Sequence, residues 1–297
     1  MRLRFLAPAL TLVLAPPLSA QQQDFSKVEV KSEKLAEGVY MLTGSGGNLG
    51  LSIGKSGALV IDDQYAPLSE KILAAIKTLT PDPVRFVVNT HWHGDHTGGN
   101  ENMAKAGAFL VAHENVRKRM GSEQFIAMFD RKVPASPEAA LPVVTFAEAV
   151  TFHWNGDEVR AFHVAPAHTD GDTIVQFVKA DVVHMGDCFF NGNFPFIDSS
   201  SGGKVDGIIA AADRVLGAIS DKTRVIPGHG PVATKADLQA YRDTVKSVRD
   251  RVAKLKAEGK AKDAVVAAKP TAEFDAKWGQ GFIKPDVFVG LVYDSLP

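Results

Sequence analysis

The sequence predicts an α+β fold in which two β-sheets are sandwiched between two helical layers, a four-layer αββα sandwich. Two strand-rich halves, each flanked by segments of helical periodicity, indicate this architecture. A third observation concerns a candidate site, because the histidine-rich stretch Thr90–Gly99 begins two positions after the end of the apolar, β-branched run Val84–Val88. We therefore expect a polar loop at the C-terminal end of a buried strand, where open α/β architectures place their sites.

The composition is that of an ordinary globular protein. The chain has 297 residues, of which 45% are hydrophobic and 23% charged, and this length allows one large or two small domains. The formal net charge of -1 gives no electrostatic reason to expect nucleic acid or an anionic membrane as a partner. The single cysteine, Cys188, excludes an intrachain disulfide.

The N-terminus has the pattern of a secretory signal peptide over residues 1–20. A basic start at Met1–Arg4 precedes the apolar run Phe5–Ala15, and Leu18-Ser19-Ala20 forms a small-residue cleavage site. The alternatives are an uncleaved anchor or a buried N-terminal helix, and the prolines of this segment disfavour a regular helix. We expect a periplasmic or secreted protein with no membrane span after cleavage.

The first half of the mature chain alternates strands with helical segments. Residues 21–35 are expected to form a polar leader, and residues 36–297 a single domain with a C-terminal helical extension. An apolar helical face runs from Leu68 to Leu79, and Pro81 and Pro83 end it. Strands are expected at Gly38–Leu42, Asn48–Ile53, Ala58–Ile61, Val84–Val88 and Ala108–Val111.

The second half turns to antiparallel strands and then to helices. Between the halves, the prolines of Gly121–Pro142 predict a mobile loop or connector. Asn155-Gly156 joins two alternating runs and predicts a hairpin. Thr234 and Asp237 predict the capped start of a long amphipathic helix, packed on the body or forming a dimer seam. Further strands are expected at Thr173–Val178, Val182–Met185 and Arg224–Ile226, and helices over Ile208–Leu216 and Phe274–Trp278.

Four potential metal ligands fall within six positions of the polar loop. They are His91, His93, Asp95 and His96. Imidazole is the commonest metal-binding side chain, and carboxylate is a good hard ligand. In an extended segment, residues two apart point the same way, so His91 and His93 can bind one metal. Asp95 and His96 follow the turn at Gly94 and can face a second one.

This His-x-His-x-Asp-His motif resembles the signature of the metallo-β-lactamase superfamily. The family's further partners follow in the expected order, each after an apolar run. They are His168 in His-Thr-Asp-Gly-Asp-Thr, Asp187 in Gly-Asp-Cys, and His229 in Pro-Gly-His-Gly-Pro. The resemblance spans residues 36 to 235 and uses five of the nine histidines.

The resemblance implies an αββα sandwich with a dinuclear metal centre at one edge of the sheet pair. It implies a first metal held by His91, His93 and His168, a second held by Asp95, His96 and His229, and Asp187 bridging the two. Two zinc ions suit this donor set best, and iron or manganese also fit. In one β-lactamase subclass a cysteine takes the place of the aspartate, so Cys188 is the alternative ligand. Asp62 is expected to orient the histidine loop through hydrogen bonds.

The function that the resemblance implies is hydrolysis of a carbonyl substrate by a metal-bound hydroxide. Asp95 is the expected catalytic residue, orienting the nucleophile and carrying its proton. The bond is an amide, lactone or ester, with β-lactamase activity as the first choice. The alternatives are a glyoxalase-like thioester hydrolase, a persulfide oxygenase and, from another class, a non-catalytic metal-binding protein. Asn191 stands where the cysteine-ligand β-lactamases have a carboxylate-binding lysine, and Lys204 is a candidate replacement.

An aromatic segment, Phe189–Ile197, directly follows Asp187. Gly192 and Pro195 break the strand pattern, so we expect Phe194 and Phe196 to line the mouth of the site. Phe189 and Phe190 are as readily explained by packing under the sheet. We therefore expect a small, partly apolar carbonyl substrate with a nearby anionic group and no organic cofactor. The sequence leaves the oligomeric state open.

Overall fold

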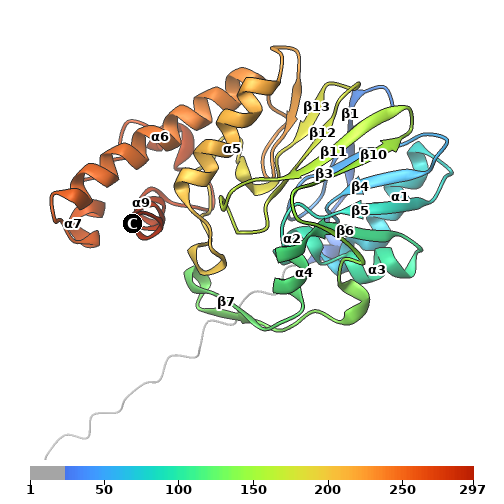
Figure 1. Cartoon of the computed structure of the whole chain (residues 1–297), viewed down its shortest axis with the longest axis horizontal. Helices are drawn as coiled ribbons and strands as arrows, with labels where there is room; N and C mark the ends of the chain where they lie inside the picture. The colour runs from blue at the N-terminus through green and yellow to red at the C-terminus, as the bar shows by residue number, and fades with distance from the viewer. Residues whose placement is uncertain (1–23) are drawn as a thin grey trace, which may run out of the picture.

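Two β-sheets packed face to face form the centre of the molecule in the computed structural model, which describes residues 24–297 (Figure 1). The first sheet has seven strands in the order β1-β2-β3-β4-β5-β6-β9. Their bounds are β1 Lys31–Ala36, β2 Val39–Thr43, β3 Leu49–Ser52, β4 Ala58–Ile61, β5 Val84–Val88, β6 Phe109–His113 and β9 Val144–Phe146. The second has five in the order β10 Ala149–Trp154, β11 Asp157–His163, β12 Thr173–Phe177, β13 Val182–His184 and β14 Arg224–Ile226.

Helices cover the outer face of each sheet and complete the αββα sandwich predicted from the sequence. On the first sheet lie α1 (Ser69–Leu79) and α3 (Asn100–Lys105). On the second lie α5 (Val205–Ala218) and α6 (Lys235–Ala257), and α9 (Pro285–Ser295) packs against α6, at the left of Figure 1. The chain also contains α7 (Lys262–Ala267) and α8 (Asp275–Trp278).

Three apolar layers follow from this arrangement, and strand alternation produces them. In β4, Leu59 and Ile61 belong to the layer between the two sheets. Ala58 and Val60 belong to the layer beneath α1. Because successive strand side chains point to opposite faces, a strand buried on both sides must be apolar throughout. The third layer joins the second sheet to α5, α6 and α9.

The parallel strands place the polar loop at one sheet edge. β4, β5 and β6 run parallel to one another, so their carboxyl ends meet at the same edge. In the second sheet, β13 and β14 are also parallel. The segments that follow these strands therefore come together at one end of the sandwich.

Three parts of the structure differ from the sequence prediction. The first strand, β1, begins at Lys31, inside the segment expected as a polar leader. α7 and α9 were not predicted, so the short helix α8 is not the last one.

The expected signal peptide, residues 1–20, lies outside the described residues. Within residues 24–297, no helix combines the length and the apolar character that a bilayer crossing requires.

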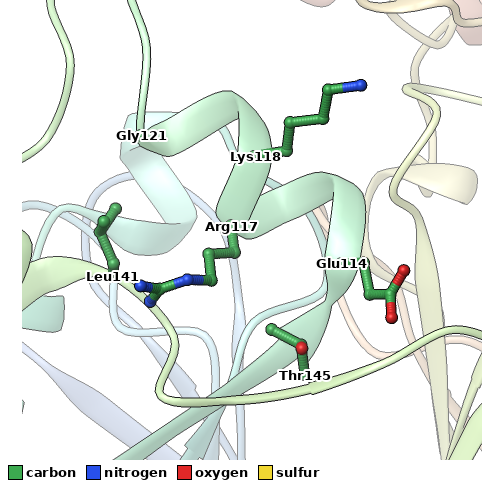
Figure 2. Close-up of a pocket in the computed structure, with 6 residues that line it drawn as sticks. All are labelled: Glu114, Arg117, Lys118, Gly121, Leu141 and Thr145. Carbon is green, nitrogen blue, oxygen red and sulfur yellow. The ribbon is translucent and has the colours of Figure 1, made fainter.

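The segment Gly121–Pro142 is a connector that contains regular secondary structure. It contains the short hairpin β7 (Gln124–Ile126) and β8 (Arg131–Val133). At its end, Arg117 of α4 (Glu114–Met120) lies beside Leu141 (Figure 2) and donates to the carbonyl of Pro142 at 2.6 Å. Side-chain contacts therefore hold the connector on the body.

The long helix α6 begins as the sequence predicts. Thr234 and Asp237 form a capping box, in which each side chain accepts from the other's backbone N–H. Its apolar face, Leu238 to Val252, is buried against the second sheet and the neighbouring helices. This confirms packing on the body and removes the need for a dimer seam.

Candidate metal centre

Segments from both halves of the chain bring all seven expected ligands together. The first half contributes the loop after β5 and the short helix α2 (Gly94–Thr97). The second contributes the β11–β12 loop, the 3-10 turn η5 (Gly186–Cys188) and the loop after β14. The residues so assembled are His91, His93, Asp95, His96, His168, Asp187 and His229.

Four of these side chains form a first, fully buried group. His91, His93, His168 and Asp187 each offer one donor atom, and these atoms lie within 4.8 Å of one another. The shortest separation, 2.8 Å, joins Nε2 of His168 to Nδ1 of His93. The extended backbone before α2 lets His91 and His93 face the same point, as the sequence predicts.

Three further side chains form a second group beside the first. Asp95, His96 and His229 also place one donor atom each within 4.8 Å of one another. Nε2 of His229 lies 3.3 Å from Oδ2 of Asp95 and 3.4 Å from Nε2 of His96. This group is closer to solvent, because Asp95 and His229 are partly exposed.

Asp187 lies between the two groups and faces both. Its Oδ1 lies 3.1 Å from His96 and 3.4 Å from His229. Its Oδ2 lies 3.5 Å from His168 and 3.8 Å from His91. Each carboxylate oxygen is therefore directed to a different group of donors, which is the arrangement a bridging ligand needs.

Hydrogen bonds fix the remaining nitrogen of the imidazoles, so that the other nitrogen faces the centre. Asp62 accepts from Nδ1 of His96 at 2.7 Å, and also from the backbone and hydroxyl of Thr90. Asp62 thus ties the histidine loop to the end of β4, as expected. In the same way, Nδ1 of His168 donates to the carbonyl of Phe196 at 2.8 Å.

His93 uses a partner that the sequence did not reveal. Its Nε2 donates to Oδ2 of Asp198 at 2.9 Å, so its Nδ1 faces the centre. Ser201 donates to the same carboxylate, and Trp92 donates to Ser201 at 3.1 Å. Asp198 follows an apolar run and precedes three serines, a pattern that indicates only a turn. No spacing rule connects it to a histidine 105 positions earlier.

Two glycines allow this close packing. A Cβ on Gly228 would lie 2.0 Å from Oδ1 of Asp187. A Cβ on Gly47 would lie 2.1 Å from the ring of His96. Any larger residue at either position would displace a candidate ligand.

The pKa values and the unpaired buried atoms of the centre indicate a site suited to cations. Burial lowers the pKa of His168 to about 4. Burial also opposes ionisation of Asp187, yet the surrounding imidazoles hold the pKa of its carboxyl well below the usual range. Nε2 of His91 and Oδ1 of Asp187 are buried without any hydrogen-bond partner among residues 24–297. Burial lowers the pKa of His91 as well, whereas Asp187 raises the pKa of His96 and of His229 against the effect of burial. Imidazoles gathered around an ionised carboxylate, with unpaired buried donor atoms among them, fit divalent metal ions.

Cys188 takes no part in the centre. Its thiol is buried in the apolar layer beneath α5 and α6, and burial raises its pKa well above the ordinary value. Asp187 and Cys188 are neighbours on the turn η5, and of the two only Asp187 reaches the donor groups.

A cavity of about 700 Å³ opens onto the centre. Phe190 and Phe196 line it, and their rings stack against His229 and His93 respectively. Phe190 is therefore part of the cavity wall as well as of the core. Lys204 does not line the cavity. Side chains that the sequence did not indicate also line it, namely Tyr65, Trp92, Ile126, Phe129, Arg131, Val133, Asn193, Phe282 and Ile283.

The fold and the paired histidine–carboxylate groups together define a metal-binding hydrolase of the αββα class. A family model for the metallo-beta-lactamase superfamily matches residues 53–258. The chain therefore belongs to the metallo-beta-lactamase superfamily, and it is a hydrolase with a His/Asp cluster that can bind metal ions.

Similar proteins span several activities. A hydroxyacylglutathione hydrolase of Polaromonas sp. is 28% identical over 228 residues, which is 73% of this chain and 74% of the relative. The alpha subunit of a 2,4-dinitroanisole O-demethylase of Nocardioides sp. is 25% identical over 141 residues, 47% of this chain and 40% of the relative.

Solved structures agree on the fold. A metallo-beta-lactamase from Pontibacter korlensis has a TM-score of 0.59 at 22% identity, covering 73% of this chain and 99% of the other. An inverting sec-alkylsulfatase from Pseudomonas sp. has a TM-score of 0.66 at 18% identity, covering 89% of this chain and 50% of the other. At such identities the likeness concerns the fold alone.

Proposed function

We propose that this protein is a dinuclear metal-dependent hydrolase that cleaves a small carbonyl substrate. The observation that carries the proposal is the position of Asp187, whose two carboxylate oxygens face different groups of buried donors. His91, His93 and His168 would hold one ion, and Asp95, His96 and His229 the other. Histidine nitrogens with two carboxylates favour zinc, while iron and manganese fit the same donors.

The chemistry divides between the ions and the chain. Metal ions bound here would lower the pKa of a coordinated water and polarise the substrate carbonyl. Asp95 is partly exposed at the cavity wall, so its carboxylate can orient the attacking water and carry its proton to the leaving group. Phe190 and Phe196 exclude bulk water from one side of the centre.

An ester, lactone or amide is the proposed substrate, and a thioester is the second candidate. The thioester is favoured by the relative with broad coverage, the hydroxyacylglutathione hydrolase of Polaromonas sp.. A β-lactam remains a member of the amide class. The structure leaves Lys204 without a role in binding a β-lactam carboxylate, because it lies outside the cavity.

A metal titration combined with a substrate panel tests the proposal. Protein purified without chelator is loaded with zinc, iron or manganese and assayed on a chromogenic β-lactam, an aryl ester, a lactone and a thioester. We expect hydrolysis of at least one substrate, saturating near two ions per chain, and none in Asp187→Ala. A saturated metal content near zero, or equal activity in Asp187→Ala, would contradict the dinuclear hydrolase.

We further propose that the protein is exported and acts in the periplasm or outside the cell. The support is the sequence of residues 1–20, which lies outside the described part of the chain. Cell fractionation with N-terminal sequencing tests this. We expect a mature chain beginning at Gln21 in the exported fraction, and an intact N-terminus in the cytosolic fraction would contradict export.

A further inference from the structure

The hairpin β7–β8 forms one wall of the cavity, and its register decides which side chains point inward. Ile126 pairs with Arg131, and Val133 follows two positions later, so these three side chains share one face of the hairpin. All three line the cavity. Lys132, which pairs with Phe125, lies on the other face and outside the cavity.

Among residues 24–297, Arg131 is the only lysine or arginine that lines this cavity. Within residues 24–297 its side chain has no ion pair or hydrogen bond, although it lies among charged residues. Neighbouring cations are paired: Lys132 lies 3.2 Å from Glu123, and Arg119 binds both carboxylate oxygens of Asp170. An exposed guanidinium that faces a cavity without a protein partner is free to bind a ligand anion.

Aromatic side chains surround the mouth of this cavity. The ring of Phe129, at the tip of the hairpin, lies 5.5 Å from that of Phe196 and 5.7 Å from that of Phe282. Phe129 is 42% exposed and Phe282 69% exposed. Large aromatic rings grouped at a cavity mouth, in contact with one another yet open to water, indicate a surface that binds an apolar group.

From these observations we infer that Arg131 selects a substrate that carries a carboxylate on a bulky apolar acyl group. The inference rests on the proposed function, because it assigns a binding site to the part of the hydrolase substrate that lies away from the metal centre. The apolar group packs between Phe129, Phe196 and Phe282. The planar guanidinium binds the distal carboxylate through two parallel N–H donors.

A pair of matched substrates isolates this contact. The two are esters of the same leaving group, one with a 4-carboxyphenylacetyl and one with a 4-carbamoylphenylacetyl acyl group. They have nearly the same size, but only the first is an anion. We expect wild-type protein loaded with metal to prefer the anion about tenfold in kcat/KM, through a lower KM. In Arg131→Gln the preference disappears because only the anionic substrate loses affinity.

Two further variants separate recognition from general charge. Lys132→Gln removes the same charge from the next position of the strand, on the opposite face, and should keep the preference. Arg131→Lys keeps the charge but loses the two-donor geometry, so it should retain only part of the preference. A loss of preference in Lys132→Gln equal to that in Arg131→Gln, or equal losses for both substrates in Arg131→Gln, would overturn the inference.

A binding measurement keeps this test independent of catalysis. Binding of 4-carboxyphenylacetamide and of its neutral carbamoyl analogue to chelator-treated protein is followed by tryptophan fluorescence, since Trp92 lines the cavity. We expect tighter binding of the anion by wild type and by Lys132→Gln but not by Arg131→Gln. If neither ester is hydrolysed while this binding difference holds, the proposed cleavage of esters fails and the assignment of Arg131 stands. Equal binding by all three proteins would refute the assignment of Arg131.

Discussion

At the scale of single residues, hydrogen bonds to one ring nitrogen decide which nitrogen of His96 and of His93 faces the centre. Asp62 occupies Nδ1 of His96, and Asp198 occupies Nε2 of His93. These two neighbours in the motif therefore present different ring atoms to the centre. Such hydrogen bonds hold each ring in place and raise its basicity as a ligand. The ligand geometry thus depends on residues that a motif does not contain.

The first prediction separates Asp187 from its neighbour Cys188. Asp187→Ala removes the side chain directed to both donor groups, so we expect the loss of at least one ion and of activity. Cys188→Ser changes a thiol buried away from the centre and should leave the metal content unchanged. Elemental analysis of both proteins checks this. Metal loss in Cys188→Ser but not in Asp187→Ala would reverse the assignment.

The second prediction concerns Asp198 as a positioning residue. Asp198→Ala frees Nε2 of His93, so the ring can rotate and we expect about 10- to 100-fold weaker binding of the ion held by His93. Competition with a chromogenic chelator measures this affinity. Asp198→Asn retains an acceptor oxygen and should recover part of the metal affinity. Metal affinity unchanged in Asp198→Ala would show that Asp198 serves only the turn.

The third prediction revises the role of Phe194. The sequence analysis predicted this ring at the mouth of the site, where it would contact the substrate. In the structure Phe194 borders the cavity, but it is only 1% exposed and its ring stacks on Phe288 of α9 at 4.6 Å. Truncation of such a buried ring costs about 3–5 kcal/mol of stability. We therefore expect Phe194→Ala to unfold at a markedly lower temperature.

The exposed ring of Phe282 is the matched control for Phe194. Phe282→Ala should raise KM and leave the unfolding temperature nearly unchanged, because this ring is 69% exposed. Thermal denaturation of both variants, together with their KM values on the best substrate, separates the two roles. A normal unfolding temperature for Phe194→Ala with a raised KM would restore the interpretation made from the sequence.

At the scale of elements, regular patterns were predictable and short or irregular ones were not. The hairpin around Asn155 was predicted because two alternating runs flank a turn dipeptide. The hairpin β7–β8 was missed because strands of three residues are too short to show a period. The helix α9 was also missed, although Pro285 occupies a position typical of a first turn.

Some residues of the candidate site were likewise predictable from the sequence, and others were not. Four of the expected ligands stand out as one dense motif, and the resemblance to the superfamily signature supplied the other three. Asp198 and Arg131 were not predictable, because each acts through a contact between distant segments. Asp198 reaches His93 across 105 positions, and Arg131 reaches the cavity through the register of a hairpin that the sequence did not show.

The fourth prediction concerns a contact between the two sheets. His113 ends β6 and His163 ends β11, and their rings stack at 3.7 Å with an angle of 9°. Burial lowers the pKa of both rings, and in His113 the charge of His163 lowers it further. The carboxylates of Glu114 and Asp170 raise the pKa of His113 and so offset part of this decrease. At His163, Asp170 raises the pKa while Arg214 lowers it.

The sign of the effect on stability follows from these lowered pKa values. The unfolded chain takes up protons near pH 6.5, before the folded chain does, so stability is lost as the pH falls below that value. His113→Gln should therefore lose less stability than wild type between pH 7.5 and 5.5 in urea denaturation. Exposed His153→Gln is the control and should behave as wild type. An identical pH dependence in His113→Gln would exclude the stacked pair as its source.

At the scale of the whole molecule, the centre joins the two halves of the sandwich. The loop after β5 and helix α2 supply four of the seven ligands, and the second sheet supplies the other three. Asp187 is thereby within 4 Å of histidines from both halves. Ions bound between them would connect the two sheets at this edge.

The last prediction concerns removal of the metal from the intact protein. Ligands that bind only the folded state stabilise it by about 2.7 kcal/mol for each site at 100 times the dissociation constant. Chelation leaves ionised Asp187 and its imidazoles buried without a partner ion, and this cost is one source of the affinity for metal. We therefore expect calorimetry to show a lower unfolding temperature after chelation and recovery on adding zinc. Asp187→Ala provides the control, because a protein that has already lost the bridge should respond much less to chelator. An unfolding temperature that chelator does not change in wild type would mean that the ions do not connect the two sheets.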